Sequence, residues 1–368
     1  MRIKTVLLLM LGAIVAAFAF NRGGEQENTI ILPPPDNVPA ETVKVIAENL
    51  EIPWDMAFLP GGEILVTERP GRLSRLAADG SLTAIPIDGI KKTGEGGLLG
   101  LMLHPKFAEN KFLYIYLSSP GIDEPTQNSV VRYKLTADKL SDKKVIISGI
   151  PGAIYHDGGR MEFGPDGMLY VTTGDATTPA LAQNPESLAG KILRLNDDGS
   201  IPKDNPFGTA VYSYGHRNPQ GLAWDASGKL WETEHGRSGA LSGLDELNLI
   251  KKGANYGWPE IEGDKAKSSM TIPALHSGPD VTWAPASLAY LDGYLYFGGL
   301  RGESLYRAKV DREKISGYQA FFKGEFGRIR TVRVGPDGML YLTTSNRDGR
   351  GAPKANDDKI IRIDPSGL

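Results

Sequence analysis

One pattern of apolar and polar positions recurs along most of the chain. An apolar pair is followed by a turn containing Gly, Asp or Pro, and then by an alternating apolar strand that often ends in a polar residue. Six copies occur, at residues 57–71, 103–118, 162–175, 223–236, 289–302 and 334–346. Their spacing of roughly 45 to 65 residues fits one four-stranded blade per copy, with loops of varying length.

This pattern predicts the fold class. The apolar residues alternate in short runs bounded by turn residues, and no long stretch shows sustained helical periodicity. We therefore predict an all-β chain folded as a six-bladed β-propeller with four-stranded blades. A two-sheet sandwich is the competing architecture, and the repeated blade-like units make it the weaker one. The segment 357–365 is expected to pair with 63–69 or its neighbour and so close the ring.

The first 40 residues differ from the rest. Residues 1–20 place Arg2 and Lys4 ahead of an apolar run that ends in small residues, which is typical of an export signal. An uncleaved membrane anchor is the alternative, although the run is slightly short for a bilayer. Residues 21–40 are polar and proline-rich and are interpreted as a linker, which leaves 41–368 for the propeller.

Composition narrows the location and the partners. The chain has no cysteine, so export without disulfides indicates a periplasmic or secreted protein, membrane-anchored only if the signal stays uncleaved. We expect no stable membrane insertion after cleavage. A net charge of −3 gives no electrostatic footprint for nucleic acid.

In a propeller the loops that connect the strands surround a central channel and usually carry the function. The stretch 155–175 is the first candidate, because it places His156 and Asp157 on a glycine-rich turn and ends a second strand at Asp175. If its two strands form a hairpin, Asp175 returns close to His156. A carboxylate beside an imidazole can set its tautomer and support its action as a general base. A surface hairpin with an incidental histidine is the alternative.

Two further loops carry groups suited to an anionic or carbonyl ligand. Glycines flank Glu95 in the segment 91–107, where the backbone could approach a ligand closely, or where the chain could simply cross tightly between blades. Arg217 and Asn218 offer a forked cation beside a neutral amide, a combination suited to a polarised oxygen. Such a pair is also common on protein surfaces.

A set of cations lies near the final blades. Arg328 and Arg330 are two positions apart, so on a strand they would face the same side and repel each other unless an anion lies between them. With Arg217 and Arg301 they could form a ring of cations in the channel, whose ligand would be a multiply charged anion. A solvated edge strand is the alternative.

The glycine-rich segment 232–260 is a candidate calcium site. Carboxylates and exposed carbonyls are the oxygen donors that calcium takes, six to eight at a time. Asp245 and Glu246 are the candidate side chains, and a polar loop tip is the alternative. Three other histidines have no partner visible in the sequence and are interpreted as structural: His104, His235 and His276.

These motifs together resemble the glucose/sorbosone dehydrogenase family, which includes soluble aldose sugar dehydrogenases that depend on pyrroloquinoline quinone (PQQ). The resemblance rests on GEGGLLGLMLHPKF, HDGGRMEFGPDGMLYVTTGD, NPESLAGKILRLNDDGSIPKDNPF, YGHRNPQGLAWD, DELNLIKKGANYGWP and GRIRTVRVGPDG. It covers about residues 45 to 365 in order, and it implies the same six-bladed propeller that the repeat count predicts.

The resemblance implies PQQ and calcium as cofactors and a role for each motif. His156 would be the general base, Asp175 its orienting carboxylate, and Arg217 with Asn218 the contact to the reactive quinone carbonyl. The other implied cofactor-binding residues are Glu95, Arg301, Arg328 and Arg330. The implied metal ligands are the carbonyls of Gly236 and Arg237 for the cofactor's calcium, and Glu246 with the Tyr256 carbonyl for a second calcium near Asp245.

The resulting hypothesis is oxidation of the C1 hydroxyl of an aldose to the lactone, with a separate external electron acceptor. Tyr155, Glu95 and Arg301 differ from the best-known glucose-oxidising member of the family, so the resemblance does not specify the sugar. A calcium-dependent lactone hydrolase of propeller fold is one alternative, although it would need acidic and amide residues around its metal. A non-catalytic sugar-binding or protein-binding propeller is the other.

Overall fold

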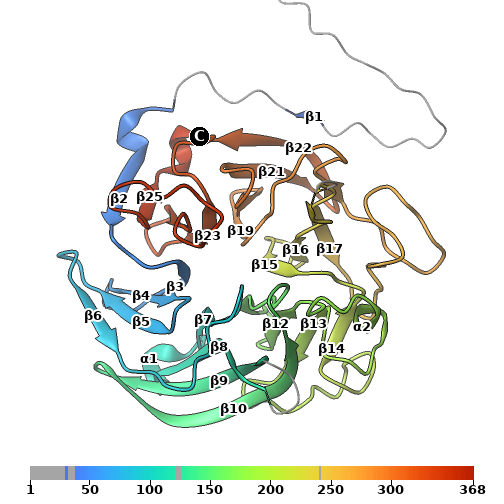
Figure 1. Ribbon diagram of the computed structural model, residues 1–368, viewed down its shortest axis with the longest axis horizontal. Coiled ribbons are helices and arrows are strands. Elements are labelled where there is room, and N and C mark those ends of the chain that lie inside the picture. The colour runs from blue at the N-terminus through green and yellow to red at the C-terminus, as the bar shows by residue number, and fades with distance from the viewer. Residues whose placement is uncertain (1–29, 32–37, 122–125, 240–241) are drawn as a thin grey trace, which may run out of the picture.

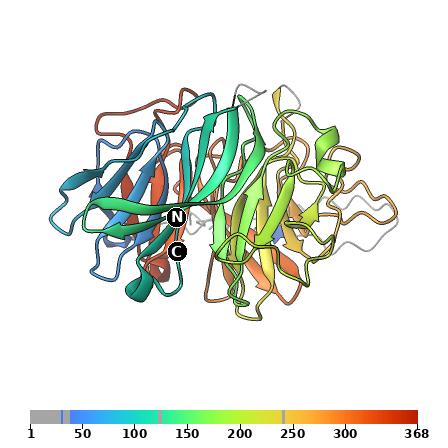
Figure 2. The same cartoon turned by 90° about the horizontal axis from the view of Figure 1, so that it is seen from below.

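The chain forms six antiparallel sheets arranged in a ring around a central channel (Figure 1). The computed structural model describes residues 30–31, 38–121, 126–239 and 242–368. The expected export signal, 1–20, lies outside these residues, as does most of the expected linker. In the side view the strands are inclined across the thickness of the disc (Figure 2).

Each sheet is one blade, and the predicted six-bladed propeller with four-stranded blades is confirmed. Blade 1 consists of β3 (Pro53–Phe58), β4 (Ile64–Glu68), β5 (Arg72–Leu76) and β6 (Leu82–Ile85). Blade 2 consists of β7 (Leu98–Leu103), β8 (Phe112–Pro120), β9 (Thr126–Thr136) and β10 (Lys139–Gly152). Blade 3 consists of β11 (Met161–Phe163), β12 (Leu169–Thr173), β13 (Lys191–Leu195) and β14 (Val211–Tyr214).

The remaining three blades complete the ring. Blade 4 consists of β15 (Pro219–Trp224), β16 (Leu230–Glu234), β17 (Glu246–Ile250) and β18 (Leu275–His276). Blade 5 consists of β19 (Ala289–Leu291), β20 (Tyr294–Gly298), β21 (Leu305–Asp311) and β22 (Lys314–Phe321). Blade 6 consists of β23 (Ile329–Val334), β24 (Leu340–Thr344), β25 (Ile360–Ile363) and β2 (Val43–Ala47).

Every copy of the sequence repeat spans the turn between the first two strands of one blade. The first strands, β3, β7, β11, β15, β19 and β23, contact their neighbours around the ring and so lie innermost. The polar ends of the second strands therefore reach one end of the channel. Among the described residues the α-helices are single turns, α1 (Phe107–Asn110) and α2 (Ala180–Gln183), and no helix has the length and apolar character needed to cross a bilayer.

The prediction that the segment 357–365 pairs with 63–69 or its neighbour to close the ring is wrong. β25 pairs with β24 and, on its other edge, with β2, in a register that places Val43 opposite Ile363. Residues 63–69 instead pair within blade 1. The early segment 43–47 therefore completes the last blade, which joins the two ends of the propeller. The expected linker also adds a short parallel strand, β1 (Ile30–Ile31), to the edge of β22.

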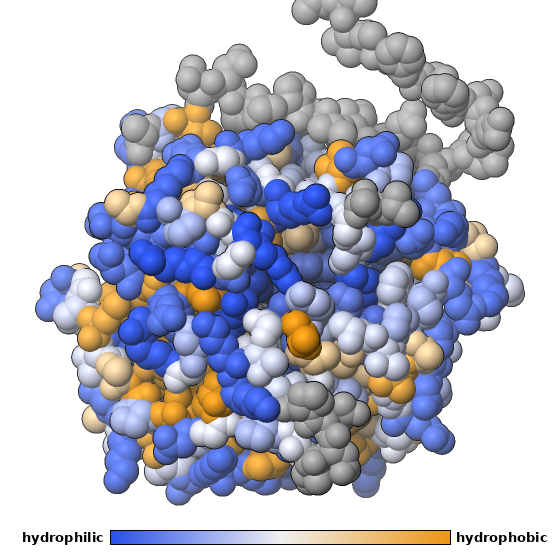
Figure 3. All heavy atoms as spheres, viewed as in Figure 1, coloured by the Kyte–Doolittle hydropathy of each residue, from blue (hydrophilic) through white to orange (hydrophobic). Residues whose placement is uncertain are grey.

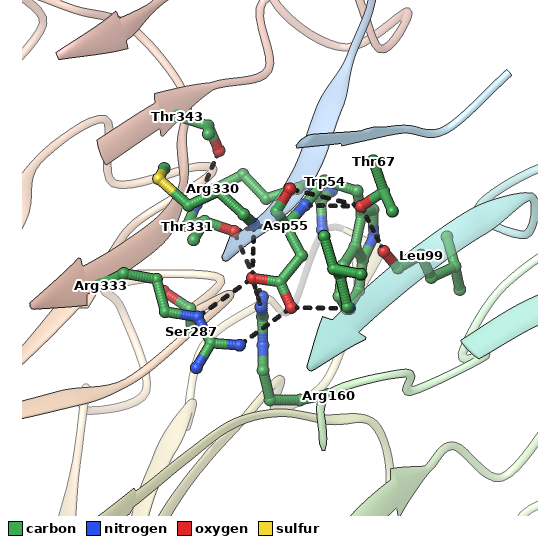
Figure 4. Close-up of polar contacts among 12 residues, drawn as sticks. Trp54, Asp55, Thr67, Leu99, Arg160, Ser287, Arg330, Thr331, Arg333 and Thr343 are labelled. Atoms are coloured by element: carbon green, nitrogen blue, oxygen red, sulfur yellow. Dashed lines mark hydrogen bonds and ion pairs between the residues drawn. The ribbon is translucent and has the colours of Figure 1, made fainter. Parts of the chain in front are cut away.

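A buried polar cluster connects all six blades inside the channel, and Figure 4 shows its centre, where Asp55 meets Arg160 and Arg333. Asp55 of blade 1 accepts hydrogen bonds from the Leu101 amide of blade 2 and from Arg333 of blade 6, and its Oδ1 lies 2.7 Å from Arg160 Nη1, just before β11. Arg160 in turn donates to the carbonyls of Gln220 in blade 4 and Ala286 beside blade 5, both at 3.0 Å.

Charge pairing makes this cluster stable despite its burial. Burial alone would raise the pKa of Asp55, but the charges of Arg160 and Arg333 lower it below its ordinary value. The cluster therefore contains an ionised carboxylate between two guanidinium groups. It fills the channel interior beneath the face that carries the candidate site.

Candidate active site

A cavity of about 410 Å³ opens at one end of the channel. The space-filling view shows polar side chains gathered around the hollow at the centre of this face (Figure 3). The cavity is lined by Glu95, Tyr155, His156, Arg217, His235, Gly236, Arg237, Ser238, Gly239, Asp245, Thr282, Ala284, Leu300, Arg301, Arg328 and Arg350. Most of the residues singled out in the sequence therefore meet here.

The pair His156 and Asp175 forms as the sequence analysis predicts. The imidazole Nδ1 lies 2.7 Å from Asp175 Oδ1, and Asp175 is fully buried. The carboxylate also accepts hydrogen bonds from the Trp258 indole and the Thr177 amide, both at 2.8 Å. With Nδ1 engaged, Nε2 is the nitrogen available to the cavity.

Local backbone geometry brings this pair together. His156 adopts a left-handed conformation with φ of 66°, which turns the chain sharply where the loop meets blade 3. A Cβ on Gly174 would lie 1.9 Å from the His156 carbonyl oxygen, so only glycine allows the end of β12 to pass this close. Asp157 faces away from the imidazole, and its carboxylate accepts from Asn128 and the Ala153 amide.

Glu95 links the catalytic loop to a cation. One oxygen accepts from the His156 amide at 3.0 Å, and the other pairs with Arg350 at 2.6 Å. Burial alone would raise its pKa, but the charge of Arg350 and the amide hydrogen bond lower the pKa of Glu95 to about 2. Glu95 is therefore an anion at any physiological pH.

Arg217 and Asn218 lie beside the imidazole. Arg217 lines the cavity, donates to Ser238 Oγ at 2.8 Å and to the His235 carbonyl, and stacks on Trp258. No carboxylate of the described residues pairs with its side chain. Burial lowers its pKa. Asn218 is fully buried; its oxygen accepts from the Gly158 amide, while its Nδ2 has no hydrogen-bond partner among the described residues.

The predicted ring of four cations is only partly observed. Arg301 and Arg328 line the cavity with Arg217, but Arg330 is buried behind it, donating to Gln220 and stacking on Trp54. Burial lowers the pKa of Arg330 to about 9.

The anion expected between Arg328 and Arg330 is part of the protein. Asp348 Oδ2 accepts from Arg328 Nη2 at 2.7 Å, and its charge also acts on Arg330. A bound ligand is therefore not needed to explain this arginine pair.

The candidate ligands for the cofactor's calcium lie at the cavity wall. Gly236 and Arg237 both line the cavity. Asp245 accepts three backbone hydrogen bonds, from the amides of Gly236, Trp283 and Ala284 at 2.8, 2.6 and 2.9 Å. Asp245 therefore secures the loop that presents the Gly236 and Arg237 carbonyls, and both of its oxygens are already engaged.

Glu246 and Tyr256 belong to a second, smaller cavity. It is also lined by Glu234 and Glu262, which makes it rich in carboxylate oxygens. Burial raises the pKa of Glu234 and of Glu246 to about 8, and the neighbouring carboxylates reinforce this. Paired buried carboxylates with raised pKa values are suited to a hard cation such as calcium.

Several residues of the site were not predicted from the sequence. His235, expected to be structural, lines the cavity, and its buried Nε2 has no partner among the described residues. Arg350, Asp348 and Trp258 were also missed. The sixth repeat offered a signal, because its polar end continues directly into the NRDGR segment that contains Asp348 and Arg350.

The chain is similar to known sugar dehydrogenases. The family model for Glucose / Sorbosone dehydrogenase matches residues 50–353. Aldose sugar dehydrogenase YliI of Escherichia coli is 33% identical, over 83% of this chain and 91% of that protein. Quinoprotein glucose dehydrogenase B of Acinetobacter calcoaceticus is 36% identical, over 61% of this chain and 54% of its own length.

A solved structure is also similar. The PQQ-bound form of an aldose sugar dehydrogenase from Streptomyces coelicolor is 41% identical, with a TM-score of 0.81 and coverage of 89% of this chain and 99% of that one. The family model covers most of the chain, which therefore belongs to the glucose/sorbosone dehydrogenase family.

Proposed function

We propose that this chain oxidises the C1 hydroxyl of aldose sugars to the lactone, with PQQ and calcium as cofactors. The observation that carries the proposal is the His156 and Asp175 pair, with Nε2 available to a cavity whose arginines exceed its carboxylates. The names of the E. coli and S. coelicolor proteins and the PQQ bound to the latter support the same activity.

The cavity fits an anionic quinone. Within the part of the chain that the structure describes, neither Arg217 nor Arg301 pairs its side chain with a carboxylate: Arg217 donates to Ser238 Oγ, and Arg301 donates to Ser242 Oγ. His235 lines the cavity, and its buried Nε2 has no partner among the described residues; such a group is costly unless a ligand satisfies it. Asn218 Nδ2 also has no partner among these residues, but Asn218 is fully buried and does not belong to the cavity lining. A carboxylate or carbonyl oxygen of a bound cofactor would supply an acceptor at the cavity wall. PQQ supplies the hydride acceptor that no amino-acid side chain provides.

The chain's own residues handle the proton. His156 Nε2 removes the proton of the C1 hydroxyl, and the positive charge that forms on the ring is stabilised by Asp175 through Nδ1. Asp175 remains oriented because the Trp258 indole and the Thr177 amide hold its oxygens. Once this proton is lost, hydride can leave C1, and C1 becomes the carbonyl carbon of the lactone. Arg217 lies where it can stabilise oxygen charge that develops during the reaction.

Calcium would occupy two places. The carbonyls of Gly236 and Arg237 would hold the ion that binds the cofactor, and the second cavity would hold another through Glu246 and the Tyr256 carbonyl. Repeated turnover would also need an external electron acceptor. The export signal expected at residues 1–20 would place this reaction in the periplasm or outside the cell.

The charge of the cavity disfavours the hydrolase alternative. A calcium-dependent lactone hydrolase would need acidic and amide side chains around its metal, whereas five arginines and two carboxylates line this cavity. A purely sugar-binding propeller would not require the buried Asp175 behind His156.

Reconstitution tests the proposal directly. Purified apoprotein is combined with PQQ and calcium, an aldose and a dye acceptor, and dye reduction is followed. We expect reduction only when both cofactors and an aldose are present. Absence of reduction with every aldose, together with lactone hydrolysis, would contradict the proposal.

A histidine pair provides the matched control. His156→Ala should lower turnover by about 10²–10⁴-fold while the protein still binds PQQ, because only the general base is lost. His276→Ala removes a histidine that pairs with Asp264 outside the cavity, and it should leave turnover unchanged. Equal turnover in the two variants would refute the assignment of His156.

A further inference from the structure

Tyr155 lies at the mouth of the active-site cavity in an unusual position for a large side chain. It is the residue directly before His156, it lines the cavity, and 46% of it is exposed. Large aromatic side chains usually bury their faces. An aromatic ring left open beside the general base is therefore available to a ligand.

One face of the ring is already occupied. The guanidinium of Arg350 lies over it, 5.3 Å from the ring centroid, in a cation–π contact. Arg350 is itself fixed by its 2.6 Å ion pair with Glu95. Tyr155 nevertheless remains 46% exposed and part of the cavity lining, so this contact does not cover the whole ring.

The backbone of Tyr155 is held on both sides by the same residue. The Glu95 amide donates to the Ile154 carbonyl at 2.9 Å, and the Glu95 carboxylate accepts from the His156 amide at 3.0 Å. A Cβ on Gly94 would lie 2.0 Å from the Ile154 carbonyl oxygen, so glycine permits this close approach. Glu95 thus fixes the ring relative to the general base, both through the backbone and through Arg350.

From this arrangement we propose that Tyr155 forms a subsite for the pyranose ring of the sugar. The faces of a pyranose carry axial C–H bonds with slight positive charge, and the face of an aromatic ring is negative. Stacking on Tyr155 would place the sugar next to His156 and orient its C1 hydroxyl. The substrate class is then cyclic aldoses with an unobstructed C–H face, and the inference rests on the function proposed above.

The experiment measures sugar binding both with and without turnover. The holoenzyme is prepared with PQQ and calcium as wild type, Tyr155→Ala, Tyr155→Phe and Ile154→Ala. KM for D-glucose and for the dye, and kcat, are obtained by steady-state kinetics. Binding of 1,5-anhydro-D-glucitol, which lacks the C1 hydroxyl and cannot be oxidised there, is measured by calorimetry or saturation-transfer NMR.

Tyr155→Ala should raise the KM for glucose and the Kd of the analogue about tenfold, which corresponds to about 1.4 kcal/mol and lies at the upper end of the range for stacked aromatic rings. The KM for the dye and the PQQ affinity should not change. Tyr155→Phe should restore sugar affinity to within about twofold, because the ring face carries the contact and not the hydroxyl. Ile154→Ala removes a neighbouring apolar side chain that is 57% exposed and does not line the cavity, and it should bind sugar as wild type does.

Unchanged sugar affinity in Tyr155→Ala would overturn the subsite, and a rise confined to the KM for the dye would overturn it in favour of acceptor binding. Analogue binding separates this result from the proposed function. If glucose is not oxidised but analogue binding depends on Tyr155, the reaction is wrong and the subsite is correct. If oxidation proceeds and Tyr155→Ala has no effect on either constant, the reaction stands and the subsite is refuted.

Discussion

The orientation of His156 by Asp175 can be tested with one substitution, Asp175→Asn. Oδ1 accepts from both the imidazole and the Thr177 amide, and Oδ2 accepts from the Trp258 indole. An asparagine cannot satisfy all three donors. With its oxygen toward His156, its NH₂ group opposes the indole N–H; with its NH₂ group toward His156, it opposes the Thr177 amide instead.

Both orientations weaken the general base. The first removes the negative charge that stabilises the protonated imidazole, and the second favours the tautomer with its proton on Nε2, which cannot accept another. A hydrogen bond to a charged group contributes about 1.5–3 kcal/mol, and a buried donor left without an acceptor costs about 1–3 kcal/mol. A combined loss of about 3–5 kcal/mol in the transition state corresponds to roughly 10²–10⁴-fold in kcat.

Asp157→Asn is the matched control. Asp157 is also buried and is closer to His156 in sequence, but its Oδ1 accepts from Asn128 and Ala153, and its Oδ2 has no partner among the described residues. Asparagine can therefore keep both bonds. Burial also raises the pKa of Asp157 to about 7, so loss of its charge is a small change.

The assay is dye-linked turnover of aldose by the reconstituted holoenzyme, with PQQ affinity measured separately for each variant. Asp175→Asn should lose kcat with little change in PQQ affinity, whereas Asp157→Asn should stay within about twofold of wild type. Equal kcat in the two variants would falsify the reasoning. A larger loss of kcat in Asp157→Asn than in Asp175→Asn would mean that Asp157, and not Asp175, orients His156.

Three further predictions concern stability and cofactor binding. Asp55→Asn removes the carboxylate that pairs with the buried Arg160 and leaves Arg333 with Glu162 as its ion-pair partner, and it should lower the free energy of unfolding by about 3–5 kcal/mol in denaturant titrations. Asp337→Asn breaks a partly exposed pair with Arg362 and should lower the free energy of unfolding by less than about 1 kcal/mol; similar losses in the two variants would contradict the central role of the channel cluster. Chelation of calcium should lower the melting temperature more at pH 9 than at pH 6. Without a cation, Glu234 and Glu246 have pKa values of about 8, so both are protonated at pH 6, whereas above pH 8 both are ionised and repel each other. An effect of chelation that does not depend on pH would exclude a cation between them. Arg301→Gln should weaken PQQ binding about tenfold in fluorescence titrations, while kcat at saturating PQQ is retained. Unchanged PQQ affinity would show that Arg301 does not bind the cofactor.

The repeat pattern alone was sufficient for the blade count, because each copy contains the turn and second strand that every blade must have. The position of His156 and Asp175 at the channel end also followed from the pattern, since Asp175 is the polar end of the third copy and His156 lies on the loop that leads into it. Ring closure did not follow, because β2 is a short strand without the repeat, and its pairing with β25 joins residues more than 300 positions apart.

The predicted ring of cations was only partly correct because it assumed regular alternation along a strand. Regular alternation would place Arg328 and Arg330 on the same face, but Arg328 lies before the start of β23, and the register of β23 shifts between Ile329 and Thr331. One arginine consequently lines the cavity and the other enters the channel interior. The compensating Asp348 comes from the turn after β24, and no spacing rule connects it to the two arginines.

By itself the sequence determined which residues form the strands of the blades and which polar groups lie at the ends of those strands, because both features depend on local alternation and turn chemistry. Only the tertiary structure decided which of those groups meet. Asp175 rather than Asp157 orients His156, His235 turns toward the cavity, and Glu95 pairs with Arg350 across 255 positions of sequence. These choices depend on how six blades converge on one channel, where side chains distant along the chain share a single buried volume and must satisfy each other's charges and hydrogen bonds.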